Sequence, residues 1–524
     1  MVNFIQTLLL LLSISLSLSF DLELTYMAND GQDFPIEEAT ITAIHQAFSQ
    51  NKLTCRQLVD YYLNRIETLN PILRAVVEIN PDAQALADVA DQERENGHQL
   101  GALHGIPVLV KDTIGTKDKM GTTAGSYALV GSVVARESTA VERLRKGGAV
   151  ILGKASLSEW YKLRSIDHLP NGWSARAGQG VNPYVKSADP CGSSSGSAIS
   201  VAANLVAVSL GTDTHSSIIC PSDHNSAVGL RPTVGLVSRA GVIPISSRQD
   251  TVGPICRTVS DCVYVLDEIA GFDPRDEEAT KRSSKFIPQG GYKQFLKEDG
   301  LKGKRLGIVR HPFVSSLHES TVAQAFERHL KTLREKGAIL VDDLEISNIG
   351  EILNPHHSGE LTAMLADFKH AIPEYLEGLE SSPVRSLADI IAFNENNPEL
   401  EKTNEYGQDG FIEAENMHGN EEEIEQIVEH LDKLNKEGFE KMMEENKLDA
   451  MVTPGTKAIP VMAIGGYPGI TVPAGYDEHG IPFGMLFSGL KGTEPKLIES
   501  AYGFEQATLA RKPPLFDSPK WLQG

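Results

Sequence analysis

Basic residues are in the minority in this chain, and this limits what the chain can bind. The sequence has 48 Lys and Arg against 70 Asp and Glu, which gives a formal net charge of −22 at pH 7. Because phosphate backbones are bound by clustered Lys and Arg, this balance argues against a nucleic-acid partner. The 524 residues are 41% hydrophobic, enough for a core that depends on neither a metal nor a disulfide framework.

Cysteine is also scarce. The five cysteines are too few and too scattered to form a disulfide framework: Cys55, Cys191, Cys220, Cys256 and Cys262. One bridge can form in an oxidising compartment, and the odd number then leaves at least one thiol over. None of the cysteines has the spacing to a histidine that a zinc site needs, and we expect neither a metal nor a cofactor.

Apolar runs long enough to cross a membrane are missing after the first twenty residues. Leu8 to Leu12 is an unbroken apolar run, continued by alternating Ser and Leu as far as Phe20, which suits the core of a signal peptide. No Lys or Arg precedes this run, so an uncleaved anchor is the alternative. We expect residues 1–19 to be a signal peptide and the mature chain to be secreted or held in an endomembrane or vacuolar lumen, with no stable membrane span.

The order of apolar patterns predicts an α/β fold. A short buried strand over residues 106–110 is followed by a helix over 139–146 and a strand over 149–152. A second helix–strand unit is predicted between residues 305 and 341. The segment from about 355 to 447 is acidic and helical, and strands return after it, so we expect one domain over residues 20–524 with a helical insertion that shapes substrate entry.

The first candidate for chemistry is the turn Gly192 to Ser197. A flexible Gly/Ser linker is one interpretation, but the turn leads directly into an apolar helix start. The turn also matches G-x-S-x-G with Ser194 at its centre, as in a nucleophile elbow. That elbow needs a strand immediately before it, and Pro190 disfavours one there.

The second candidate is the turn Gly211 to Ser217, which follows a predicted strand over residues 205–210. Reactive groups of α/β proteins are placed in such turns, and successive backbone amides there can form an oxyanion hole. His215 is a candidate general base, although a lone histidine in a polar turn is more often simply hydrogen-bonded. Lys111 is the third candidate, because a lysine that ends a buried strand loses solvation and can act as a neutral base.

Several segments together resemble the amidase signature family. The order and spacing of these stretches carry the resemblance: Gly105–Asp112, Gly192–Ala198, Gly211–Pro221, Val228–Gly235, Gln249–Pro254, Arg257–Val259, Gly466–Gly475 and Glu505–Thr508. The resemblance is closest to the peptide-amidase-like branch, and it implies a three-layer α/β/α fold with a mixed central sheet.

The resemblance also implies roles for individual residues. The family's catalytic lysine falls on Lys111, its bridging serine, which follows a cis peptide bond, on Ser193, and its nucleophile on Ser217. The oxyanion-hole amides fall on Thr214, His215 and Ser216. The activity implied is hydrolysis of linear amides, of a small molecule or a peptide, through an acyl-enzyme; the sequence leaves a homodimer open.

One departure from the family lies beside the nucleophile. The family usually has Gly before the nucleophilic serine, whereas this chain has His215-Ser216. If that position needs a positive φ, we expect Ser216 to cost about 1–2 kcal/mol. Two rival functions therefore stay open: a repurposed member that binds ligands with little or no hydrolysis, and an acyltransferase that uses the same acyl-enzyme.

Overall fold

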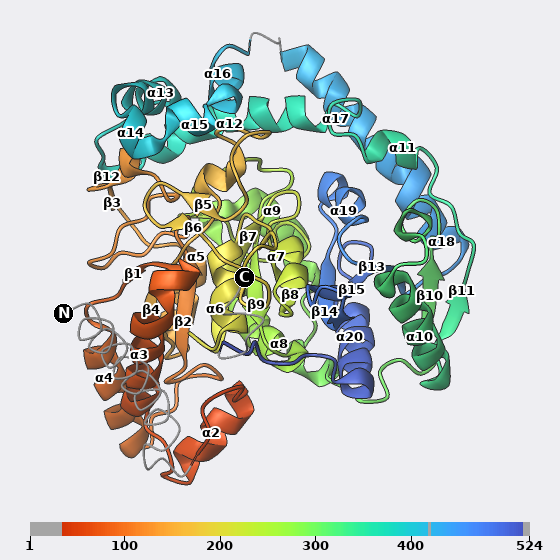
Figure 1. Cartoon of the computed structure of the whole chain (residues 1–524), viewed down its shortest axis with the longest axis horizontal. Helices are drawn as coiled ribbons and strands as arrows, with labels where there is room; N and C mark the ends of the chain where they lie inside the picture. The colour runs from red at the N-terminus through yellow and green to blue at the C-terminus, as the bar shows by residue number, and fades with distance from the viewer. Residues whose placement is uncertain (1–33, 418–420, 517–524) are drawn as a thin grey trace, which may run out of the picture.

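The computed structural model describes residues 34–417 and 421–516 (Figure 1). The predicted signal peptide, residues 1–19, lies outside the described residues. Within them, no helix combines the length and the apolar character needed to cross a membrane.

The fold is organised around one mixed sheet of 11 strands. From one edge to the other the strands are β1 (Val76–Ile79), β4 (Val150–Ala155), β2 (Pro107–Lys111), β7 (Val208–Asp213), β9 (Thr251–Cys256), β8 (Val228–Arg231), β14 (Gly469–Tyr476), β15 (Pro482–Ser488), β13 (Ala450–Pro454), β10 (Arg305–Ile308) and β11 (Ile339–Val341). β2 runs parallel to both β4 and β7, whereas β7 runs antiparallel to β9. β2, β4 and β7 are buried along their whole length, and the apolar runs in β2 and β4 are typical of buried strands.

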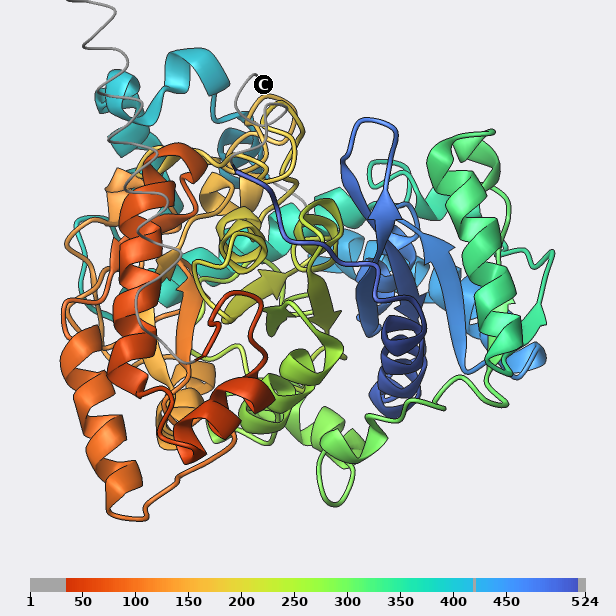
Figure 2. The ribbon, with the colours of Figure 1, turned by 60° about the horizontal axis from the view of Figure 1, so that its bottom comes forward.

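Helices cover both faces of the sheet (Figure 2). One layer contains α5 (Thr139–Lys146), α8 (Val259–Ile269), α10 (Thr321–Glu335) and α20 (Glu494–Thr508), and the other contains α6 (Ser195–Ala202), α7 (Ile219–His224) and α19 (Ile459–Gly465). Three helices, α2 (Ile41–Ser49), α3 (Cys55–Leu73) and α4 (Ala83–Glu95), precede β2 in the chain; α3 and α4 lie near the β1 edge, whereas α2 contacts α8. The predicted three-layer α/β/α fold with a mixed sheet is confirmed.

The acidic segment after residue 355 is mainly helical. It contains α12 (Glu360–Glu377), α13 (Leu387–Asn396), α14 (Pro398–Glu401), α15 (Thr403–Tyr406), α16 (Asp409–Glu415), α17 (Glu421–Asn435) and α18 (Lys441–Glu445), with the short strand β12 (Leu379–Ser381) paired to β3 (Val133–Val134). In Figure 1, α12 and α17 form an arch along the top of the molecule. The first residue of α12, Glu360, is buried and reaches the site described below.

The described chain also contains further short elements. Among them are α9 (Glu277–Ser283), α11 (Ile349–Ile352) and the hairpin of β5 (Trp173–Ser174) and β6 (Gly178–Gln179). A buried cluster that includes Trp160, Phe368 and Phe411 joins the loop after β4 to α12 and α16. This packing holds the helical segment against the same end of the sheet at which β2 and β7 finish.

Candidate active site

Lys111 ends β2 and lies beside the end of β7. The two strands are paired in parallel, with Val110 opposite Leu210, and the Lys111 side chain reaches Thr212, two residues further along β7. Its side chain is fully buried, and its Nζ donates to Thr212 Oγ1 at 3.0 Å and to Ser193 Oγ at 2.7 Å. The structure therefore brings together two of the three residues of the predicted relay.

The environment of Lys111 favours the neutral amine. Burial lowers the pKa of Lys111 well below its usual range, and the more distant charges of Asp213 and Asp250 offset only part of this effect. The closest groups are hydroxyls, a carbonyl and the face of the Tyr161 ring, whose centre lies 4.7 Å from Nζ. A neutral lysine amine can accept a proton, which an ammonium group cannot.

Ser193 and Ser217 lie on neighbouring turns. The peptide bond between Gly192 and Ser193 is cis, as the family resemblance implies, and Ser193 is almost fully buried. The next amide, that of Ser194, donates to the carbonyl oxygen of Ser217 at 3.2 Å, which joins the two turns. Ser217 itself is partly exposed. No hydrogen bond joins the hydroxyls of Ser193 and Ser217 within the described residues.

The turn that carries Ser217 is held in place by the buried ion pair of Asp213 and Arg231. We call residues 213–218 the nucleophile loop, after the role predicted for Ser217. The carboxylate of Asp213 accepts from the Ile218 amide at 2.6 Å and also binds the guanidinium of Arg231. Arg231 is fully buried and donates further to the carbonyl oxygens of Gln249 and Tyr467. These contacts close the loop and fix the position of its backbone.

Several backbone amides in the middle of the nucleophile loop have no hydrogen-bond partner among the described residues. The amides of Thr214, His215 and Ser216, the predicted oxyanion-hole donors, and the amide of Ser217 donate to no other residue that the structure describes. The Thr214 side chain is anchored by a 2.6 Å hydrogen bond from its hydroxyl to Asp250. Neither His215 nor Ser216 has a positive φ, so the condition under which Ser216 would strain the backbone is not met: the loop turns without the left-handed conformation that favours glycine.

The side chain of His215 contacts a carboxylate and not a serine hydroxyl. Its Nδ1 lies 2.9 Å from Oε1 of Glu360, the same atom that accepts from Gln249 Nε2 at 2.7 Å. Burial lowers the pKa of His215, but the Glu360 carboxylate outweighs burial and raises it overall. The interpretation of His215 as a hydrogen-bonded side chain thus agrees with the structure, and its ring makes no contact with Ser217 that would support a general base.

The two alternatives for the first turn are wrong. Residues 192–197 are buried and lead into α6, which excludes a flexible linker. No strand immediately precedes Ser194 in the described chain, and its hydroxyl is buried and donates to the Thr212 carbonyl at 3.1 Å. Ser194 is therefore a structural residue that ties α6 to the end of β7.

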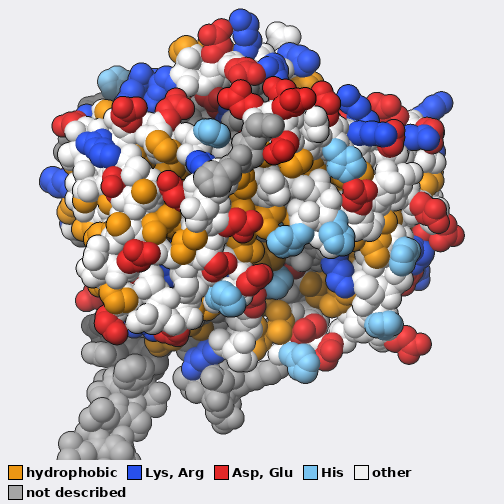
Figure 3. Space-filling view, turned by 90° about the horizontal axis from the view of Figure 1, so that it is seen from above, with side chains coloured by type: hydrophobic (Ala, Val, Ile, Leu, Met, Phe, Trp, Pro, Cys, Tyr) orange, Lys and Arg blue, Asp and Glu red, His pale blue; other side chains and the backbone are white. Residues whose placement is uncertain are grey.

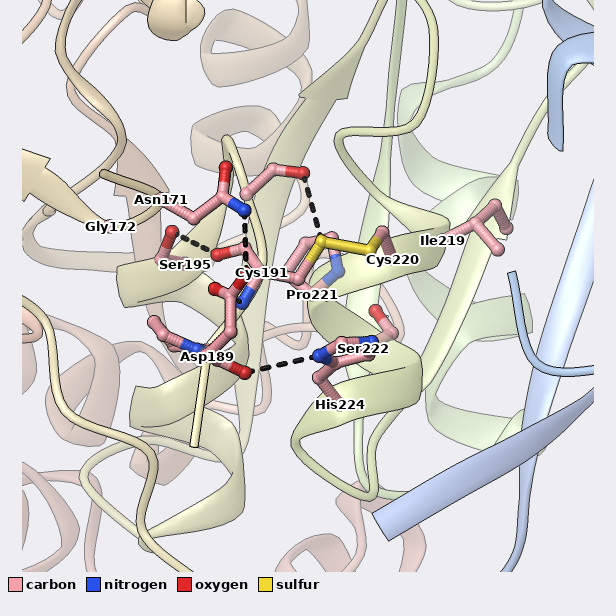
Figure 4. Close-up of a disulfide and its surroundings, with 12 residues drawn as sticks. Asn171, Gly172, Asp189, Cys191, Ser195, Ile219, Cys220, Pro221, Ser222 and His224 are labelled. Atoms are coloured by element: carbon pink, nitrogen blue, oxygen red, sulfur yellow. Dashed lines mark hydrogen bonds between the residues drawn. A yellow bond between two sulfur atoms is a disulfide. The ribbon is translucent and has the colours of Figure 1, made fainter. Parts of the chain in front are cut away.

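A disulfide joins the two serine turns (Figure 4). Cys191 precedes Ser193 by two residues, and Cys220 follows Ser217 by three; the two cysteines are bonded, with their Cα atoms 5.8 Å apart. The Ser195 hydroxyl donates to the Cys191 carbonyl at 2.6 Å, which also binds this turn to the start of α6. Cys55, Cys256 and Cys262 are free and buried.

Comparisons with known proteins identify the family of this chain. The family model described as Amidase matches residues 57–498. The chain is 58% identical to a protein of Arabidopsis thaliana named as a probable amidase, over 92% of each chain. The solved structure of native peptide amidase from Stenotrophomonas maltophilia is 41% identical, with a TM-score of 0.86 over 92% of this chain and 100% of that one. An amidase family protein from Bacillus anthracis is 35% identical, with a TM-score of 0.85 over 94% and 97%. The chain belongs to the amidase family of amide-hydrolysing enzymes.

Proposed function

We propose that this enzyme hydrolyses linear amides, of small molecules or peptides, through an acyl-enzyme on Ser217 and a relay of Lys111, Ser193 and Ser217. The observation that carries the proposal is the 2.7 Å hydrogen bond from the Lys111 amine to the Ser193 hydroxyl in a fully buried setting. The likeness to a solved peptide amidase supports amides of peptide type as substrates.

The relay supplies the base that a serine nucleophile needs. Neutral Lys111 accepts the proton of Ser193, and Ser193 accepts that of Ser217 as Ser217 Oγ attacks the carbonyl carbon. The free amides of the nucleophile loop then face the developing oxyanion. The proton returns along the same path to the leaving nitrogen, the carbon–nitrogen bond breaks, and water releases the acid from Ser217.

The proposal is tested with a panel of primary and N-substituted amides and three variants. We expect Lys111→Met and Ser217→Ala each to lower kcat by at least about 100-fold, the smallest contribution usual for a general base. Lys154→Met is the matched control, because Lys154 is also fully buried but its Nζ donates to Ile114 O and Thr122 Oγ1, away from the serines. Undiminished turnover in Lys111→Met and Ser217→Ala would overturn the mechanism.

The two rival functions predict different results in the same assays. A member that only binds ligands would not react with a fluorophosphonate at Ser217, and none of the amides would be consumed. An acyltransferase would form the acyl-enzyme but pass the acyl group to an added amine in preference to water, which product analysis with competing amines detects.

We also propose that the chain enters the secretory pathway. The apolar run within residues 1–19 supports this localisation, as does the Cys191–Cys220 bridge, because disulfides persist in oxidising compartments. A fusion of a fluorescent protein to the C-terminus, with and without residues 1–19, tests it: cytosolic fluorescence from the full-length fusion would refute this localisation.

A further inference from the structure

A groove runs beside the nucleophile loop. Its volume is about 460 Å³, and it is lined by His215, Ser216 and Cys220, by the turn after β10 that contains Phe313, and by the loop between β13 and α19 that contains Lys457. The groove lining therefore includes the two residues that precede Ser217, as well as Cys220, three residues after it. A substrate whose carbonyl carbon lies at Ser217 would extend part of its chain into this space.

The lining of the groove carries positive charge and no negative charge. Lys457 and His215 are its ionisable residues, and no Asp or Glu is among the described residues that line it. This contrasts with the chain as a whole, whose formal net charge is −22. Lys457 Nζ donates to Ser316 Oγ at 2.6 Å, a contact between two lining residues that holds the ammonium group at the groove.

His215 is built to carry a proton. Its Nδ1 contacts the buried carboxylate of Glu360, while about 31% of its side chain is exposed at the groove. The other charged groups near it are Asp213 and Arg231, which are paired with each other. Because Glu360 lies behind the ring, a charged His215 leaves Nε2 as a donor toward the groove.

Further histidines lie next to residues that line the groove. His311 immediately precedes the lining residue Pro312, and His356 and His357 follow the lining residue Leu353 by three and four positions; all three are exposed. Figure 3 shows histidine side chains gathered around a hollow in one face of the molecule. Among the described residues, no group of His, Cys, Asp and Glu has the arrangement to hold a metal ion, so a metal does not explain these histidines.

We infer that the groove binds a carboxylate group of the substrate, so that the preferred amides carry a negative charge a few bonds from the scissile carbonyl. This inference rests on the proposed function, which it makes more specific. Lys457 supplies a positive charge that Ser316 holds at the groove, and His215 supplies a donor whose partner Glu360 holds the ring in place. Charge-assisted hydrogen bonds of this kind are stronger than neutral ones.

The test compares matched amides that differ only in charge. One pair has an acyl chain that ends in a carboxylate or in an isopropyl group of the same shape, and a second pair places the same groups on the amine side. We expect kcat/KM to favour the acidic member of one pair by roughly tenfold or more, the range of one charge-assisted hydrogen bond. We expect Lys457→Gln to move this ratio toward one, while Lys336→Gln, an exposed lysine outside the groove lining, leaves it unchanged.

The pH dependence separates a direct role of His215 from a structural one. The preference for the acidic amide should weaken as the pH rises through the raised pKa of His215, because the ring then loses its charge. In His215→Gln the preference should be smaller and should no longer change over this range. A preference that stays constant with pH in the wild type would contradict the assignment of His215.

The outcomes distinguish this inference from the proposed function. Turnover of neutral amides with no preference in either pair, or with a preference that survives Lys457→Gln, would overturn the carboxylate site and leave the hydrolase intact. If no amide is consumed, the proposed function fails, and calorimetry with glutarate tests the site by itself. Binding of glutarate that weakens in Lys457→Gln would support the site, and absent or unaltered binding would overturn it.

Discussion

Removal of the Cys191–Cys220 disulfide should lower the stability of the region in which the two serine turns are aligned. The bridge closes a segment with a sequence separation of 29 residues, and both cysteines are almost fully buried. For a loop of that length, the bridge raises the free energy of unfolding by about 3.5 kcal/mol at 25 °C, because it restricts the unfolded chain. With the entropy of unfolding usual for a chain of 524 residues, this corresponds to a decrease of about 3 °C in the melting temperature.

The assay uses the double variant Cys191→Ser/Cys220→Ser and differential scanning calorimetry with and without a dithiol reductant. We expect the double variant to melt about 3 °C below the wild type and to be insensitive to the reductant. The reductant should lower the melting temperature of the wild type by a similar amount. Cys262→Ser is the matched control, because Cys262 is a free, buried cysteine, and this variant should still respond to the reductant.

Two results would refute this reasoning. If the double variant melted at the wild-type temperature, the bridge would not constrain the chain. If its kcat were also unchanged, the contact between the Ser194 amide and the Ser217 carbonyl would be sufficient to align the turns. We expect instead that kcat falls while binding of a competitive inhibitor is largely kept, because the change affects the distance between the two serine hydroxyls.

Three further predictions concern charged groups at the site. The rate of acylation should rise with pH through the lowered pKa of Lys111, because only the neutral amine accepts a proton, and a pH–rate profile that falls over this range would contradict it. Asp213→Asn should lower the free energy of unfolding by about 3–5 kcal/mol, measured by urea denaturation, because it leaves the buried guanidinium of Arg231 without its carboxylate. His215→Gln should lower the free energy of unfolding most between about pH 4.5 and 6.5, where His215 and Glu360 are both charged. Because the pKa of His215 is raised, its contribution to stability is lost as the pH rises above this range. Because the pKa of Glu360 is lowered, its contribution is lost as the pH falls below this range. Equal loss of stability across pH 4 to 9 would contradict the ion pair.

The positions of Lys111 and of the two serine turns could be predicted because they belong to local segments. Lys111 ends an apolar strand, and the two serine turns flank an apolar helix and strand. The roles of Ser193 and Ser217 are implied by the family resemblance and not by these patterns. The strand predicted over residues 205–210 in fact begins at Val208 and ends at Asp213. Residues 205–207 are equally buried and apolar, and periodicity cannot separate a buried loop from a buried strand.

The residues that sequence reasoning missed act through long-range contacts. Arg231 reaches Asp213 from another strand, and Glu360 reaches His215 from a helix 145 residues further along the chain. Neither pairing leaves a local pattern, although Arg231 lies in one of the stretches that carry the family resemblance. The disulfide pairing was equally hidden, because five cysteines allow many connectivities.

Strain at Ser216 is expected only if its position requires the positive φ that glycine adopts readily. The structure does not meet this condition. In this chain the loop keeps a negative φ there, and the buried Asp213 closes it by accepting from the Ile218 amide. The backbone of the nucleophile loop is thus set by a side chain before it and not by the residue type at Ser216.

The central claim, that Ser217 is a nucleophile activated through Ser193 by Lys111, is tested most directly by peptide mass spectrometry after reaction with a fluorophosphonate. We predict a single adduct on Ser217 in the wild type and in Lys154→Met, with much slower labelling in Lys111→Met and in Ser193→Ala. An adduct on another residue, or amide hydrolysis that continues while Ser217 stays unlabelled, would contradict the account.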